Sequence, residues 1–317
     1  MLGAGRSAIV ALMTTARERP PGMKVIDVRA FVLQTRRAAM GIRARQRRGG
    51  CVQANGIGIH YVEAGEGEPL LLLDNAMVST NPIWASVPFA YAAFMETLAE
   101  HFRVIAPDTR GSGRSVHPGG PITSALLADD VVALIEALTL DRPLICGFSD
   151  GGETATLVGI RSPGSVRAIV NHGGYDLFNP DPQAPAIAMT RQMLGGSAGA
   201  AQADPELSAS RTPELRPMFE LMKTDHDGAQ GAGHWKAVVA QTFERITQPH
   251  GYTFEDMRTV TAPALILVGD RDPFCTVEEG VAAYRALPAG ELAVLPDTGH
   301  LITPAAVWAT IEFFERL

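Results

Sequence analysis

Apolar and polar side chains repeat along this chain with two different periods, one typical of strands and one typical of helices. Residues 57–62 alternate between apolar and polar, as expected of a strand with one buried face, whereas residues 70–73 are continuously apolar and fit a strand buried on both faces. Residues 124–140 have helical spacing, with one apolar face formed by Leu127, Val131, Leu134, Ile135 and Leu138. From about residue 51 onward, strands and helices are therefore expected to alternate.

The same alternation continues on both sides of one long interruption. Further strands are predicted at residues 103–106, 143–148, 166–171, 264–268 and 292–295, and further helices at 89–101, 155–160, 277–287 and 305–314. Alternation of this kind predicts an α/β fold, in which a mostly parallel twisted sheet is flanked by helices.

The interruption, residues 175–258, contains no convincing strand. Its helical stretches lie at residues 185–194, 213–223 and 234–246, between segments rich in Pro and Gly. We interpret residues 175–258 as an inserted helical cap, so that residues 51–174 and 259–317 form the core of the fold.

Charge is distributed unevenly between the N-terminal segment and the rest of the chain. The formal net charge of the 317 residues is −7, but residues 1–50 contain eleven Arg or Lys against Glu18 and Asp27, which leaves −16 on the remainder. An acidic body argues against nucleic acid as a partner. Residues 1–50 are predicted to be a disordered basic arm or an over-called start. In the second case translation would begin at Met23 or Met40.

Composition narrows the class of protein further. Hydrophobic residues make up 46% of the chain, which is ordinary for a globular protein, and no apolar run approaches the ~20 residues of a membrane helix, so no membrane partner is expected. Cys51, Cys146 and Cys275 are an odd number and lack metal-ligand spacing. They predict reduced thiols in a cytoplasmic protein with no metal site and no cofactor.

Two segments match the pattern Gly-x-Ser-x-Gly, and their contexts separate them. Residues 147–151 follow a predicted strand and precede a predicted helix, the arrangement that exposes a nucleophilic serine on a sharp turn. Residues 195–199 follow a helix within a Gly- and Ala-rich stretch that has no strand before it. Ser149 is therefore the predicted nucleophile, and Ser197 is predicted to be an ordinary loop residue.

A serine nucleophile needs a base, and the base needs a carboxylate that orients it. Asp270 and Asp272 follow the predicted strand at 264–268, and His300 follows the one at 292–295. The carboxyl ends of parallel strands meet at one edge of a sheet, so these groups and Ser149 are expected to converge there. The residues alone leave open which of the two aspartates contacts His300.

Three further segments join these residues into a recognisable set. They are Asp-Thr-Arg-Gly-Ser-Gly-Arg-Ser at 108–115, Gly-Asp-Arg-Asp-Pro at 269–273 and Gly-His at 299–300. With the serine motif, and in this order, the chain from about Asn55 to Leu317 resembles the α/β-hydrolase superfamily, in particular its serine-nucleophile hydrolases with a helical cap. The resemblance implies that fold, and it favours Asp272 over Asp270 as the acid that orients His300.

An oxyanion hole requires two N–H donors. The first is expected from the backbone of Asp150, the residue after the nucleophile. The second is expected from the loop after residues 70–73, but there the chain departs from the family, because Asp74 and Asn75 stand where a His-Gly pair is usual. We assign this second donor to the backbone N–H of Ala76, or of Met77 after it.

Asp74 and Asp150 also raise a question about the substrate, because carboxylates that faced an oxyanion would oppose its charge. Either they accept local hydrogen bonds, or one of them binds a substrate ammonium group. The candidate substrate-binding residues are Asp74, Met77, Trp84 and Trp235, in a pocket expected to be largely apolar.

The predicted function is hydrolysis of a small or medium carboxylic ester, lactone, thioester or amide. Ser149, His300 and Asp272 would act through an acyl-enzyme intermediate on a small molecule. The alternatives are carbon–carbon bond hydrolysis or cofactor-free perhydrolysis by the same three residues, or a ligand receptor of the same fold without catalysis.

Overall fold

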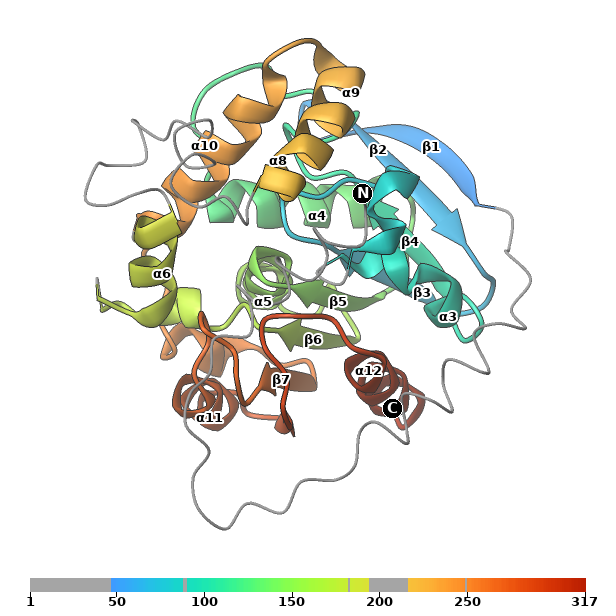
Figure 1. Cartoon of the computed structure of the whole chain (residues 1–317). Coiled ribbons are helices and arrows are strands. Elements are labelled where there is room, and N and C mark those ends of the chain that lie inside the picture. Colours follow the sequence, from blue (N-terminus) through green and yellow to red (C-terminus); the bar gives the residue numbers. More distant parts are fainter. Residues whose placement is uncertain (1–46, 88–89, 182, 194–215, 249) are drawn as a thin grey trace.

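The computed structural model describes residues 47–317 except 88–89, 182, 194–215 and 249 (Figure 1). The predicted arm up to residue 46 and the second serine motif around Ser197 therefore lie outside the described residues.

An eight-stranded sheet forms the centre of the molecule, with strand order β1-β2-β4-β3-β5-β6-β7-β8 (Figure 1). The strands from β3 to β8 are parallel, and β2 runs antiparallel to both of its neighbours. The bounds are β1 Arg48–Ala54, β2 Ile57–Ala64, β3 Pro69–Leu73, β4 Arg103–Pro107, β5 Leu144–Phe148, β6 Ala168–His172, β7 Ala264–Gly269 and β8 Gly290–Leu295. The predicted mostly parallel sheet is confirmed.

The structure departs from the sequence prediction most clearly at β1 and in the segment before β4. β1 begins at Arg48, so the core starts before residue 51, and the pattern missed this strand because an edge strand paired only with β2 needs few apolar side chains. The helix predicted at 89–101 is instead a 3₁₀ turn, η2 (Tyr91–Ala93), followed by the short α3 (Met95–Leu98). Another 3₁₀ turn, η1, covers Pro82–Ser86.

Helices cover both faces of the sheet because alternate strand residues point to opposite sides. On one face, side chains such as Leu72 and Val170 pack with α3 and with α12 (Pro304–Glu315). On the other face, Leu71 and Ile145 pack with three helices, α4 (Ser124–Ala137), α5 (Asp150–Arg161) and α11 (Val277–Ala286). The predicted layers are thus present.

The described residues between β6 and β7 form helices and no strand. They are η3 Asp176–Phe178, α6 Pro185–Met193, α8 Arg216–Met222, the π-helix η6 Lys223–Asp227, α9 Gly228–Gln230, α10 His234–Thr247 and η7 Asp256–Thr259. This agrees with the helical character expected of residues 175–258, whose division from the core as a separate cap stays a prediction.

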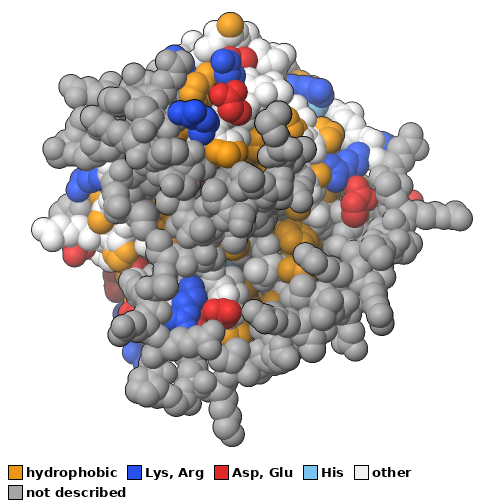
Figure 2. Space-filling view, in the orientation of Figure 1, with side chains coloured by type: hydrophobic (Ala, Val, Ile, Leu, Met, Phe, Trp, Pro, Cys, Tyr) orange, Lys and Arg blue, Asp and Glu red, His pale blue; other side chains and the backbone are white. Residues whose placement is uncertain are grey.

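Described charged side chains of both signs are visible on one face of the molecule (Figure 2). On the face shown in Figure 2, the described Lys and Arg side chains are scattered among Asp and Glu rather than gathered into one patch. Within the described part of the chain, no helix is long and apolar enough to cross a membrane.

Candidate functional site

A sharp turn between β5 and α5 holds Ser149. Its backbone has φ 56° and ψ −128°, a positive φ that non-glycine residues rarely adopt and that costs about 1–3 kcal/mol. The turn needs small neighbours, because a Cβ on Gly147 would lie inside the contact distance of the Gly151 carbonyl oxygen. The strand, the strained serine and the helix thus have the arrangement that exposes a nucleophile.

His300 follows β8 and is oriented by one of the two candidate aspartates. Its Nδ1 lies 2.7 Å from Oδ2 of Asp272, whose Oδ1 accepts the backbone N–H groups of Phe274 and Cys275. Asp270 instead accepts the backbone N–H of Thr298 through Oδ1. The geometry therefore pairs Asp272, not Asp270, with His300.

The surroundings of His300 affect its basicity. Its ring contacts those of Phe148 and Phe274, with centroids 4.7 and 4.8 Å away, and only 5% of the residue is exposed. Burial is the largest single effect and opposes the charged form, but the charge and hydrogen bond of Asp272, together with the nearby Asp176 and Asp150, outweigh it, and the net result is a raised pKa for His300. An imidazole in this setting is a stronger base than one in water.

One cavity of about 660 Å³ is bordered by both Ser149 and His300. Its other walls come from the loop after β3, the turns after β6 and β7, and the helices between β6 and β7. They include Asn75, Met77, Phe148, Gly173, Asp176, Leu177, Ala186, Thr190, Met218, Phe243, Ile246 and Phe274. The mostly apolar walls of this cavity, with a few polar groups among them, are typical of a small-molecule site.

Of the four substrate-binding candidates, only Met77 lines this cavity. Trp84 is fully buried in the core and donates its indole N–H to Asp225 over 2.6 Å, and Trp235 packs against Phe219 in the same apolar cluster. The prediction for both tryptophans is therefore wrong, because their rings pack against other core side chains instead of facing the ligand space.

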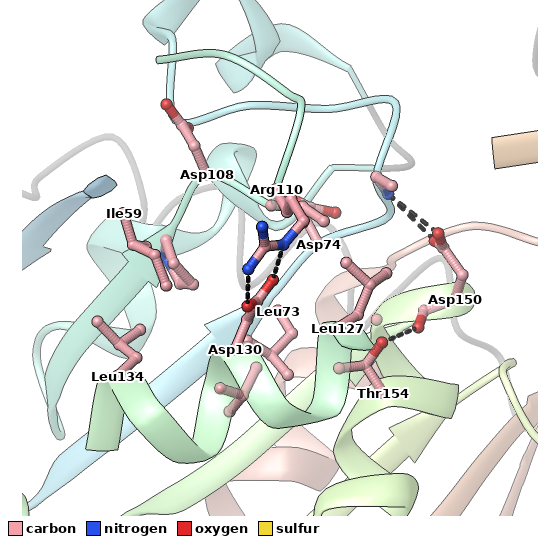
Figure 3. Close-up of a pocket in the computed structure, with 15 residues that line it drawn as sticks. Ile59, Leu73, Asp74, Asp108, Arg110, Leu127, Asp130, Leu134, Asp150 and Thr154 are labelled. Atoms are coloured by element: carbon pink, nitrogen blue, oxygen red, sulfur yellow. Dashed lines mark hydrogen bonds and ion pairs between the residues drawn. The ribbon is translucent and has the colours of Figure 1, made fainter. Parts of the chain in front are cut away.

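For both acids that the ammonium-binding hypothesis named, the structure shows the other alternative, local partners, and the hypothesis itself stays untested. Asp150 is 3% exposed, and its carboxylate pairs with the Arg245 guanidinium from α10, so its charge is already compensated. Asp74 accepts the backbone N–H of Tyr91 over 2.7 Å. Both acids line a separate cavity of about 430 Å³ whose walls do not include Ser149 or His300 (Figure 3).

The Asp150 carboxylate also contacts the loop after β3. The backbone N–H of Ala76 lies 3.2 Å from each of its oxygens, and Figure 3 shows these two contacts at the start of α5. This N–H is therefore committed to a carboxylate in the described conformation, which corrects the expectation that Ala76 donates to an oxyanion.

Sequence reasoning missed three residues that shape the site. Arg245 bonds both Asp150 and Glu153, and nothing in a single arginine on an amphipathic helix indicates such a role. Asp176 lines the cavity, and burial raises its pKa to about 8, so it is mostly protonated at neutral pH. Asn75 also lines the cavity, and the departure from His-Gly was the signal that pointed to this loop.

Asp272, Cys275 and His300 could be considered as metal ligands, since their donor atoms lie within 4.8 Å of one another. However, Asp272 and His300 bond each other, and the single S–H of Cys275 lies within hydrogen-bond distance of the Gly173 carbonyl and of Asp176. Burial, with these acids nearby, raises the pKa of the thiol well above its ordinary value. Asp272 and His300 are thus engaged with each other and Cys275 with other groups, and a thiol that keeps its proton is a poor metal ligand.

Comparisons with known proteins place the chain in one family. Residues 74–309 match the model of the alpha/beta hydrolase family. The chain is 26% identical over 266 residues to 3-oxoadipate enol-lactonase 2 of Acinetobacter baylyi, covering 78% of this chain and 88% of the relative. It is 25% identical over 253 residues to serine hydrolase BPHL of Mus musculus, covering 78% and 79%.

A solved structure shares the fold. The enol-lactonase from Burkholderia xenovorans LB400 superposes with a TM-score of 0.62, covering 84% of this chain and 98% of that one at 21% identity.

Proposed function

This chain belongs to the alpha/beta hydrolase family as a serine hydrolase, and from that premise we propose that it hydrolyses a small carboxylic ester or lactone. One observation carries the proposal. The Asp272 carboxylate holds Nδ1 of His300 at 2.7 Å, and the imidazole shares the 660 Å³ cavity with the strained Ser149. A base, an acid that orients it and a serine hydroxyl at the same cavity are the parts that acyl transfer requires.

The proposed reaction has two halves. Ser149 Oγ attacks the carbonyl carbon while its proton passes to Nε2 of His300, and Asp272 stabilises the imidazolium that forms. When the tetrahedral intermediate collapses, His300 returns that proton to the leaving alkoxide, and an acyl-enzyme remains. Water then repeats the attack with His300 as base, releasing the acid and restoring Ser149.

The cavity favours an uncharged substrate. Among the described residues that line it there is no Lys or Arg, and the one acid, Asp176, has its pKa raised by burial. A substrate carboxylate would enter this space without a cation to compensate it, which is costly in an apolar environment. We therefore propose neutral esters and lactones as the substrate class, even though the name of the relative from Acinetobacter baylyi refers to an oxoadipate.

Stopped-flow hydrolysis of p-nitrophenyl butyrate and of its anionic counterpart, p-nitrophenyl succinate, tests both the proposed reaction and the proposed substrate class. We expect a burst of one equivalent of nitrophenol from wild type with the neutral ester, no burst from Ser149→Ala, and at least a tenfold lower kcat/KM for the anionic ester. Absence of any hydrolysis by folded wild type would overturn the proposal in favour of a non-catalytic ligand receptor. Equal kcat/KM values for the two esters would overturn the substrate class alone.

A further inference from the structure

Among the described residues that line the catalytic cavity, Asp176 is the acid that the proposed reaction leaves without a role. It lies in η3, shortly after β6, and it borders the same 660 Å³ cavity as Ser149 and His300. Only 5% of the residue is exposed. A carboxyl group in a mostly apolar wall is costly to bury, so its presence beside the ligand space points to a function there.

A contact with Cys275 holds the Asp176 carboxyl near His300. Oδ1 of Asp176 lies 3.2 Å from the sulfur of Cys275, and that sulfur lies within 4.8 Å of a ring nitrogen of His300. The same sulfur lies 3.1 Å from the carbonyl oxygen of Gly173, another residue of the cavity wall. The carboxyl is therefore fixed in the part of the wall next to the base of the proposed reaction.

One oxygen of this carboxyl is uncommitted. Within the described part of the chain, the contact between Oδ1 and Cys275 is the one hydrogen bond that the Asp176 side chain makes. Oδ2 is thus without a partner among the described groups, although the residue borders the cavity. Buried polar atoms are normally hydrogen-bonded, so a molecule that enters the cavity is the natural partner for this oxygen.

The surroundings of the carboxyl keep it protonated at neutral pH. Burial is the largest effect and raises the pKa of Asp176 to about 8, and the acids Glu279 and Asp272 act in the same direction. The Cys275 thiol and His300 oppose this shift. Below that pH the group is a neutral carboxylic acid, which can donate a hydrogen bond.

The helices packed against η3 direct their charged side chains elsewhere. Near the start of α5, the carboxylates of Asp150 and Glu153 pair with Arg245, and on α6 the side chain of Arg191 is exposed. The protonation of Asp176 is therefore governed by burial and by the groups of the turns after β7 and β8 and of α11.

We propose that Asp176 binds a second, uncharged oxygen of the substrate, a ketone or ether oxygen outside the bond that is cleaved. Its carboxyl donates a hydrogen bond from Oδ2 to that oxygen, and no covalent bond changes. The inference rests on the proposed function and deepens it, because it narrows the substrate class to esters and lactones that carry such an acceptor. Asp176 is then a substrate-binding residue and takes no part in the proton transfer between Ser149 and His300.

The test uses two pairs of esters that differ by one ketone. The acyl pair is p-nitrophenyl 5-oxohexanoate and p-nitrophenyl hexanoate, and the alcohol pair is 5-oxohexyl butyrate and hexyl butyrate, followed by titration of the acid released. The ketone preference is the ratio of the two kcat/KM values within a pair. Because the ketone is remote from the reacting carbonyl, it changes the intrinsic reactivity of the ester little.

We expect wild type at pH 7 to prefer the ketone about tenfold in at least one pair, mainly through a lower KM, as one hydrogen bond to the substrate would give. Asp176→Leu should abolish this preference, and Asp176→Asn should keep it, because an amide still donates. As pH rises past about 8, wild type should lose the preference, since the carboxylate has no proton to donate, whereas Asp176→Asn should retain it.

Cys275→Ala is the control for a merely structural role. It removes the thiol that contacts Asp176 and leaves the carboxyl in the cavity wall. The ketone preference should persist in this variant. The pH at which the preference is lost should move upward, because the thiol holds the pKa of Asp176 down.

Two results would overturn the inference alone. One is hydrolysis by wild type with no ketone preference in either pair, and the other is an undiminished preference in folded Asp176→Leu. If wild type hydrolysed none of the four esters, the proposed function would fail and the inference with it, so the two failures are distinguishable.

Discussion

At the scale of single residues, the pairing of His300 with Asp272 predicts a specific pH dependence. The neutral imidazole is the base, so activity rises as pH passes through the pKa of His300, which the carboxylate raises against the effect of burial. Replacing Asp272 by Asn removes the charge that stabilises the imidazolium, so this pKa falls. We expect kcat for Asp272→Asn to fall about 10⁴-fold, with the acidic limb of the kcat/KM profile at lower pH.

Asp270→Asn is the matched control for this measurement. Its amide oxygen can still accept the Thr298 N–H that Asp270 accepts over 3.2 Å, so kcat should stay within about threefold of wild type. If the two variants behaved in the opposite way, the assignment of the acid would be wrong.

Residue types alone could not separate ligand-facing from core side chains. Met77, Trp84 and Trp235 are all large and apolar, but only Met77 lines the cavity that contains Ser149. Trp84 is held in the core by a hydrogen bond to Asp225, a residue far along the chain. The periodicity of apolar residues cannot predict a contact between such distant positions. Ser149 and His300, by contrast, could be proposed from sequence because strand ends place them.

At the scale of elements, the link between α10 and α5 predicts a stability effect. Arg245 is buried and bonds two carboxylates, Asp150 and Glu153, of α5. Arg245→Met would leave both acids buried without their cation, and we expect urea unfolding to show a loss of about 3–5 kcal/mol in the free energy of unfolding.

An exposed pair provides the control. Arg258 pairs with Glu255, and both side chains are more than half exposed, so Arg258→Met should change the free energy of unfolding by less than about 0.5 kcal/mol. Equal effects of the two substitutions would show that the buried pair contributes no more than a surface one.

The elements themselves were predictable where burial imposes a pattern. β3 and β5 are buried along almost their whole length and appear in the sequence as apolar runs, and α4 shows its apolar stripe. β1 lies at the edge of the sheet and the segment around α3 breaks into short turns, so neither has a regular period to detect.

At the scale of the whole molecule, the buried Asp74 predicts how stability depends on pH. Burial raises its pKa to about 7 from an ordinary value of 3.8. Between these values the folded state holds a proton that the unfolded state has lost, so the free energy of unfolding falls as pH rises, by about 1.4 kcal/mol per pH unit at most. This stabilising contribution is complete below pH 3.8 and lost by the time pH passes 7.

Asp74→Asn should remove this component, because an amide does not titrate and can still accept the Tyr91 N–H. Urea unfolding of both proteins at several pH values between 5 and 8 should show the variant gaining stability relative to wild type as pH rises. The exposed Asp141→Asn serves as control and should follow wild type in parallel. A difference between Asp74→Asn and wild type that did not change with pH would contradict the raised pKa.

The central claim is that Ser149 is the nucleophile of this hydrolase, and covalent labelling tests it most directly. Intact-protein mass spectrometry after treatment with a fluorophosphonate should show one adduct on wild type and none on Ser149→Ala. Ser197→Ala, which alters the second copy of the serine motif, should be labelled at the wild-type rate. An adduct on folded Ser149→Ala, or its loss in Ser197→Ala, would contradict the account.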